Sequence, residues 1–218
     1  MYSVHDTFFD EVRHEKYETV MPCNEVTVFR TKAGMGTEYK VAPMLSDSFC
    51  IILVKSGTVK LSVNYSTETL QKNSMAFLMP NMVVSLSDAD GDFMMEGVSF
   101  MPAYFDDLSA YALVYSQMIS FLNENTMPTQ SLNEDEMARM QTMLKLYSGI
   151  NKDQMHFNGL MQHLSNLLLL RFAEILKAGC AADPSKVPHT VEIYREFRKL
   201  LIGNYLKRAL HIVLFVAA

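Results

Sequence analysis

The segment from residue 25 to residue 101 constrains the fold most, because it consists of short strands separated by turns. It contains EVTVFR, the apolar run FCIILVKSG and the alternating TVKLSVNY, followed by MAFLMP, MVVSLS and FMMEGVSF. Short strands at this spacing are typical of an antiparallel sandwich or barrel. Asn73 precedes one strand where a tight turn favours left-handed backbone. No helix of useful length fits between the turns, which disfavours a parallel βαβ sheet.

After Pro102 the apolar residues follow a helical spacing instead. The fold class is therefore α+β, and Ser131 is expected to cap the second helix. Helices are predicted over residues 106–125, 131–150 and 151–179. The predicted order is an N-terminal arm (1–24), a β-barrel (25–105), a helical region (106–180), a linker (181–189), a final helix (190–208) and a tail (209–218).

Charge is distributed unevenly along the chain. Residues 1–185 carry 13 basic and 22 acidic side chains, a net charge of −9, whereas residues 186–218 have a net charge of +4. The acidic body argues against a free-standing nucleic-acid-binding protein, which usually has a basic excess. The contrast predicts two parts with different partners, although a solvated basic helix would look the same.

Cysteine use and hydropathy indicate a cytoplasmic protein without a membrane partner. Cys23, Cys50 and Cys180 are widely spaced and form no CxxC motif, which fits a reducing compartment. The N-terminus lacks the apolar stretch of a signal peptide. The longest apolar runs are far shorter than the roughly 20 residues that span a bilayer.

The histidines do not support metal chemistry in the strand region. None of the six lies between residues 25 and 101, and a metal-dependent barrel needs several ligands converging from strands. We therefore expect no metal, no cofactor and no enzymatic activity. The methionines of the strand region are either ordinary core residues or the lining of an adaptable apolar pocket.

The helix predicted over residues 151–179 is apolar over more than one narrow stripe. One apolar face can pack within the chain, and a second is most simply covered by another subunit. Burial within the monomer is the alternative. The predicted interface of a homodimer comprises His163, Leu164, Leu167, Leu168 and Phe172.

Two segments carry a resemblance to a known family. FCIILVKSGTVKLSVNYSTETLQKNSMAFLMPNMVVSL resembles the cupin-type sensor barrel of the AraC family of transcription regulators, and HTVEIYREFRKLLIGNYLKR resembles the helix that opens the family's DNA-binding domain. The likeness spans roughly residues 20–207 and is greatest to regulators of the Bacteroidales type. It implies a cupin-like antiparallel β-barrel, a double-stranded β-helix, followed by an α-helical dimerisation region.

The resemblance also implies a small-molecule effector inside the barrel. Residues expected on inward faces of strands would line its site; Arg30 is of interest because a lone charge could pair with an anionic or hydroxylated ligand, or could face water at a strand end. The predicted ligand contacts are Arg30, Tyr39, Phe49, Ile51, Met79 and Met82.

The chain departs from the family pattern in two places. Catalytic cupins carry histidines in their barrel motifs and this barrel has none, so a metal-dependent enzyme is the less favoured alternative. Only the first helix of the DNA-binding domain is present, and we interpret residues 209–218 as an aberrant tail of the kind a frameshift produces. DNA binding is then not expected without the missing helix-turn-helix units. A truncated partner that heterodimerises with an intact regulator is a further alternative.

Overall fold

The structure, a computed structural model, describes residues 17–32 and 39–179. Residues 1–16 and 33–38 lie outside the described part, as do the predicted linker, final helix and tail. All described residues belong to one compact unit, Met1–Gly179.

Two antiparallel sheets contain the ten strands of the described residues. The six-stranded sheet has the order β1-β2-β9-β4-β7-β10, and the four-stranded sheet has the order β3-β8-β5-β6. The bounds are β1 (Tyr17–Cys23), β2 (Val26–Thr31), β3 (Val41–Leu45), β4 (Phe49–Ser56), β5 (Thr58–Val63), β6 (Ser66–Gln71), β7 (Ser74–Leu78), β8 (Val83–Ser87), β9 (Met94–Phe100) and β10 (Thr129–Ser131).

The strand order identifies the β fold. From β2 to β9 the chain passes back and forth between the two sheets, so that each sheet interleaves early and late strands. This is the order of an eight-stranded jelly roll, the double-stranded β-helix of cupins. The predicted fold class is therefore confirmed, although the described strands form two separate sheets rather than one closed barrel. We call strands β2 to β9 the β-helix.

The turns of the β-helix depend on residues that tolerate left-handed backbone. Gly57, between β4 and β5, has a φ of 68°, and Asn73, between β6 and β7, has a φ of 65°. Asparagine adopts this region more readily than most residues. The expectation for Asn73 is confirmed, and its amide N–H donates to the Val54 carbonyl at 2.9 Å.

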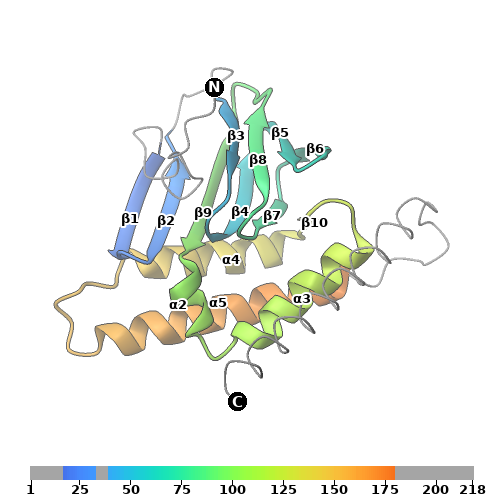
Figure 1. Ribbon diagram of the computed structural model, residues 1–218. Helices are drawn as coiled ribbons and strands as arrows, with labels where there is room; N and C mark the ends of the chain where they lie inside the picture. The colour runs from blue at the N-terminus through green and yellow to red at the C-terminus, as the bar shows by residue number, and fades with distance from the viewer. Residues whose placement is uncertain (1–16, 33–38, 180–218) are drawn as a thin grey trace, which may run out of the picture. The chain divides into compact units, whose positions relative to one another are not determined.

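Four helices of the described residues follow strand β9, and three of them were predicted in outline; the short first helix was not. They are α2 (Pro102–Asp106), α3 (Tyr111–Glu124), α4 (Glu134–Tyr147) and α5 (Phe157–Gly179). Figure 1 shows α3, α4 and α5 packed together below the strands. The Ser165 hydroxyl on α5 bonds to the hydroxyls of Tyr104 and Tyr147, at 3.1 and 2.9 Å, and so joins three helices. Burial raises the pKa of Tyr147.

The cap of α4 differs from the prediction. Asn133, not Ser131, accepts a hydrogen bond from the Glu136 amide at 2.9 Å, and Glu136 accepts one from the Asn133 amide. Both Ser131 and Asn133 precede a glutamate by three residues, so both fit the capping-box pattern. Ser131 is not free to cap because it pairs with Ser74 in the sheet.

Two predicted boundaries also differ. The end of the predicted arm, residues 1–24, forms edge strand β1, which pairs with β2. The helical region contributes strand β10 to the same sheet, where it pairs with β7. The segments that precede and follow the β-helix in the sequence therefore both add a strand to its larger sheet.

Aromatic side chains hold the helices against the six-stranded sheet. Phe77 of β7 is fully buried and makes edge-on contacts with Phe121 of α3 and Phe172 of α5, at centroid distances of 5.7 and 5.6 Å. Phe49 of β4 stacks on Phe105 of α2 at 3.9 Å. Rings at these distances contribute beyond the area they bury.

Candidate functional site

Strand register defines which residues point into the β-helix. Phe49 and Ile51 of β4 share a face with Phe77, which contacts the helices. Because side chains alternate along a strand, Cys50 and Ile52 lie on the opposite face, toward the four-stranded sheet. The interior of the β-helix is therefore lined by the Cys50 face of the six-stranded sheet.

Hydroxyl groups gather at one end of this interior. Ser99 of β9, directly opposite Cys50 and Thr27 in the sheet, donates from its hydroxyl to the Ser48 hydroxyl at 2.7 Å. Ser46 donates to the Ser48 carbonyl at 3.0 Å. All five side chains are buried. We call Thr27, Ser46, Ser48, Cys50 and Ser99 the hydroxyl cluster.

The Cys50 thiol in this cluster is unreactive. Cys50 is almost completely buried, and burial raises its pKa well above the ordinary value for a thiol. A thiol is a nucleophile only as the thiolate. Cys50 therefore acts as a small neutral side chain rather than a reactive group.

Aromatic rings fill the other end of the interior. The Tyr17 and Tyr39 hydroxyls are hydrogen-bonded to each other, and the Tyr39 ring lies 5.2 Å from that of Phe93. Phe29 lies over Gly97, where an added Cβ would be 2.5 Å from the Phe29 ring. Because Gly97 has no side chain, the Phe29 ring has room to lie over it.

The one charged residue among the buried polar residues that the structure describes is Glu96. By register it lies on the helix-facing side of the sheet, opposite Arg30, whose Nε and a terminal nitrogen are each 3.1 Å from Glu96 Oε2. Lys55 Nζ is 3.8 Å from the same oxygen. The described interior is therefore free of formal charge.

The predicted ligand residues fall into two groups. Tyr39 lies in the interior aromatic group, and Met79 and Met82 flank the turn that bonds to Ser46 through backbone groups. These three positions are consistent with an interior site. The positions of Arg30, Phe49 and Ile51 are not consistent with an interior site. Arg30 pairs with Glu96, and the other two side chains pack toward the helices.

The error in Phe49 and Ile51 has a simple cause. Strand β4 is buried on both faces along its first six residues, so no alternation of polar and apolar residues marks the inward side. Thr27, Ser48 and Ser99 were not predicted from the sequence. A signal for two of them was present, since Thr27 lies between Val26 and Val28, and Ser99 lies between Val98 and Phe100.

The predicted dimer residues also divide between two faces of α5. Leu164, Leu168 and Phe172 are buried within the chain, so they are not available to a second subunit. His163 is exposed, and Leu167 is 53% exposed. Leu160 and Leu170 are 45% and 43% exposed on the same side. We call Leu160, His163, Leu167 and Leu170 the α5 row.

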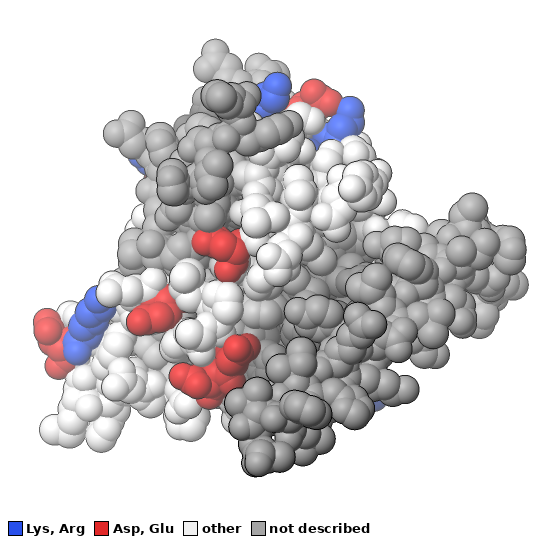
Figure 2. Space-filling model, in the orientation of Figure 1, with Lys and Arg blue, Asp and Glu red and all other residues white. Residues whose placement is uncertain are grey.

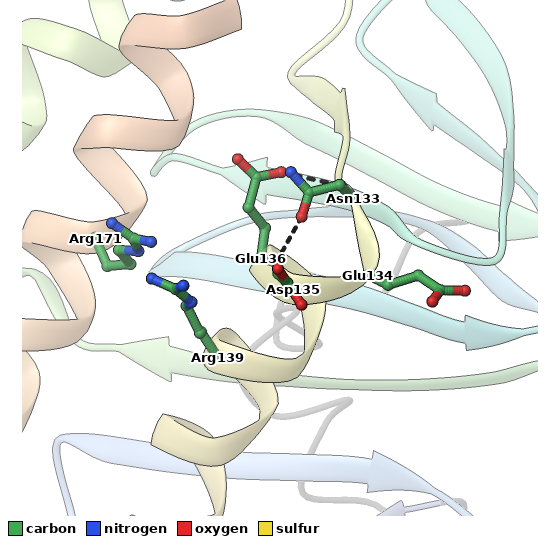
Figure 3. A pocket seen from close by; sticks show the side chains of 6 residues that line it. All are labelled: Asn133, Glu134, Asp135, Glu136, Arg139 and Arg171. Carbon is green, nitrogen blue, oxygen red and sulfur yellow. Dashed lines mark hydrogen bonds between the residues drawn. The ribbon is translucent and has the colours of Figure 1, made fainter.

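A surface pocket of about 470 Å³ lies outside the β-helix, between α4 and α5. Its lining is polar and charged, and Figure 3 shows Arg139 and Arg171 pointing toward one another across from Glu136. We call it the α4–α5 pocket. It is lined by Asn133, Glu134, Asp135, Glu136, Arg139 and Arg171.

Other kinds of site find little support in the described residues. They contain no group of three histidine, cysteine, aspartate or glutamate side chains that could hold a metal ion. Among the described helices, none has both the length and the hydropathy needed to cross a bilayer. On the face drawn in Figure 2, lysine and arginine side chains lie near the margins and form no basic patch.

No protein-family model matches the chain, and no curated protein is significantly similar to it. The chain contains a cupin-like domain, defined by its own strand order.

Three solved structures are similar to part of this chain. A cupin 2 conserved barrel domain protein from Salinispora arenicola is 13% identical, over 49% of this chain and 94% of that chain, with a TM-score of 0.36. A protein with a double-stranded β-helix domain from Klebsiella pneumoniae is 15% identical, over 47% and 94%, with a TM-score of 0.35. An RmlC-like cupin family protein from Methanocaldococcus jannaschii is 11% identical, over 39% and 78%, with a TM-score of 0.35.

Proposed function

We propose that this chain is the effector-sensing and dimerisation portion of a cytoplasmic AraC-like transcription regulator, and that it is not an enzyme. The observation that carries the proposal is the neutral, hydroxyl-bearing interior of the β-helix. Such an interior offers hydrogen bonds and apolar contacts, but no described general acid, base or metal-ligand set. DNA would be bound by helix-turn-helix units that the printed residues do not contain.

The interior restricts the chemistry of the effector. A charged ligand would lose its hydration without gaining a counter-charge, because the described interior is uncharged. A neutral molecule with hydroxyl groups could exchange hydrogen bonds with Ser48 and Ser99 at the hydroxyl cluster. We therefore propose a small neutral hydroxylated molecule as the effector. Arg30, considered as the partner of an anionic or hydroxylated ligand, pairs with Glu96 instead.

Thermal unfolding with a panel of neutral monosaccharides and sugar alcohols tests this proposal. A ligand at one hundred times its Kd stabilises the folded state by about 2.7 kcal/mol, so a binder raises Tm measurably. Ser99→Ala removes one buried hydroxyl and is expected to weaken binding about fivefold. Ser62→Ala is the control, because the Ser62 hydroxyl lies on the exposed face and bonds to Thr67.

The proposal fails if only charged compounds raise Tm, or if Ser99→Ala and Ser62→Ala bind a neutral ligand equally well. Stoichiometric iron or zinc in the purified protein, with activity that depends on it, would instead favour the metal-dependent cupin enzyme.

The proposed dimer forms through the α5 row. Leu160, His163, Leu167 and Leu170 are spaced by three, four and three residues, the spacing of a coiled-coil seam. Exposed leucines in such a row are best covered by the same row of a second copy, because a two-fold interface uses one surface twice. This proposal keeps His163 and Leu167 and replaces the buried residues with Leu160 and Leu170.

Leu167→Glu is expected to convert the dimer to a monomer, because it places a carboxylate against its own copy in an apolar seam. Light scattering coupled to size-exclusion chromatography measures the mass. Leu146→Glu on α4 is a matched control, since Leu146 is also 53% exposed but lies outside the row.

A wild-type chain that is monomeric at all concentrations tested would refute the homodimer. If it then co-purified with a full-length regulator, the heterodimer would replace it. Equal dissociation by both glutamate variants would show that the α5 row is not the interface.

A further inference from the structure

The α4–α5 pocket separates positive and negative groups. Arg139 forms no ion pair or hydrogen bond with the described part of the chain, whereas Arg171 pairs with Glu174 through one terminal nitrogen. The two guanidinium groups share one side of the pocket in Figure 3. Two guanidiniums that face each other repel, and an anionic group placed between them would accept hydrogen bonds from both.

The opposite side of the pocket is acidic. Glu136 uses one oxygen to accept the Asn133 amide, and the remaining oxygen takes no described hydrogen bond. Glu134 and Asp135 also line the pocket, although the Glu134 carboxylate points away from the arginines in Figure 3. A purely anionic ligand would be repelled by this side, and a purely cationic one by the arginines. A molecule that carries both charges would meet an opposite charge at each end.

We propose that the α4–α5 pocket binds a small dipolar molecule that bears a carboxylate and an ammonium group. Its carboxylate would lie between Arg139 and Arg171, and its ammonium group would face the Glu136 carboxylate. The volume of about 470 Å³ is within the range for small-molecule sites. This site lies outside the β-helix and is independent of the proposed effector site.

Calorimetric titration of the whole chain with 4-aminobutanoate and 6-aminohexanoate tests the proposal. Butanoate and butylammonium, each with one charge, are the half-ligand controls. At least one amino acid is expected to bind, and both half-ligands are expected to bind at least about tenfold more weakly. Binding should weaken with added salt, because the site is open to solvent.

Arg139→Gln is expected to weaken binding of the amino acid about tenfold or more. Its fold should be intact, because Arg139 is exposed and makes no described polar contact. Lys145→Gln is the control: it removes the same charge from an exposed position on α4 that does not line the pocket. Far-ultraviolet circular dichroism verifies both folds.

An NMR titration checks the calorimetry. The proposal would be overturned if both amino acids gave no heat of binding and no change in the chemical shifts of the protein. Equal binding of butanoate would also overturn it, since the site would then select anions only. Equal losses in Arg139→Gln and Lys145→Gln would show a general charge effect and no specific site. Ser99→Ala should leave this binding unchanged, which separates failure here from failure of the effector proposal.

Discussion

Gly97→Ala is expected to lower the free energy of unfolding by about 3 kcal/mol, the upper part of the usual cost of overpacking a core. An added Cβ at this position would be 2.5 Å from the Phe29 ring and closer still to the Ile51 carbonyl oxygen. The ring could rotate away, but the backbone of the adjacent strand β4 could not move without breaking the ladder. Gly97→Val should prevent folding at ordinary temperature.

Urea denaturation followed by circular dichroism measures this effect. Gly159→Ala is the matched control, because nothing lies within 4 Å of an added Cβ there and the residue is in helix α5. That variant should gain about 0.5–1 kcal/mol from helix propensity. Two alanine variants of equal stability would show that Phe29 does not lie over Gly97.

Phe77→Ala is expected to cost about 4 kcal/mol, in the range for a buried phenylalanine. Phe77 is fully buried, and its ring touches both Phe121 and Phe172. Its loss opens a cavity where α3 and α5 meet the sheet. Hydrogen exchange should therefore speed up in α3 and α5 more than in β5 and β8.

Tyr65→Ala is the control for the loss of an aromatic ring, because Tyr65 is fully exposed. Surface substitutions of this kind usually change stability by less than about 0.5 kcal/mol. If Phe77→Ala were as stable as Tyr65→Ala, the helices would not depend on the sheet for their packing.

The sequence predicted the β-helix well because its signals are local. Alternation in Thr58–Val63 and turn residues such as Gly57 and Asn73 follow from the chemistry of a few neighbouring residues. Strands β1 and β10 were missed because their pairing depends on distant partners. β10 is only three residues long, and nothing within it distinguishes a strand from a loop.

The candidate site was harder to predict because its residues are identified by which face they occupy. A one-residue error in parity moves every side chain of a strand to the other face. In β4 both faces are apolar, so Phe49 and Cys50 could not be distinguished by hydropathy. The same limit applies to α5, where Leu167 and Leu168 are neighbours in sequence but one is exposed and the other is buried.

Strand β10 has a consequence for dividing the chain into domains. It completes the edge of β7, and Thr129 at its start bonds to Glu68 of β6, in the other sheet. A fragment that ended before α2 would leave the backbone groups of β7 uncovered. Exposed strand edges recruit strands from other molecules. The minimal fragment that keeps the β-helix monodisperse should therefore extend at least through Ser131, even though the last strand of the β-helix ends at Phe100.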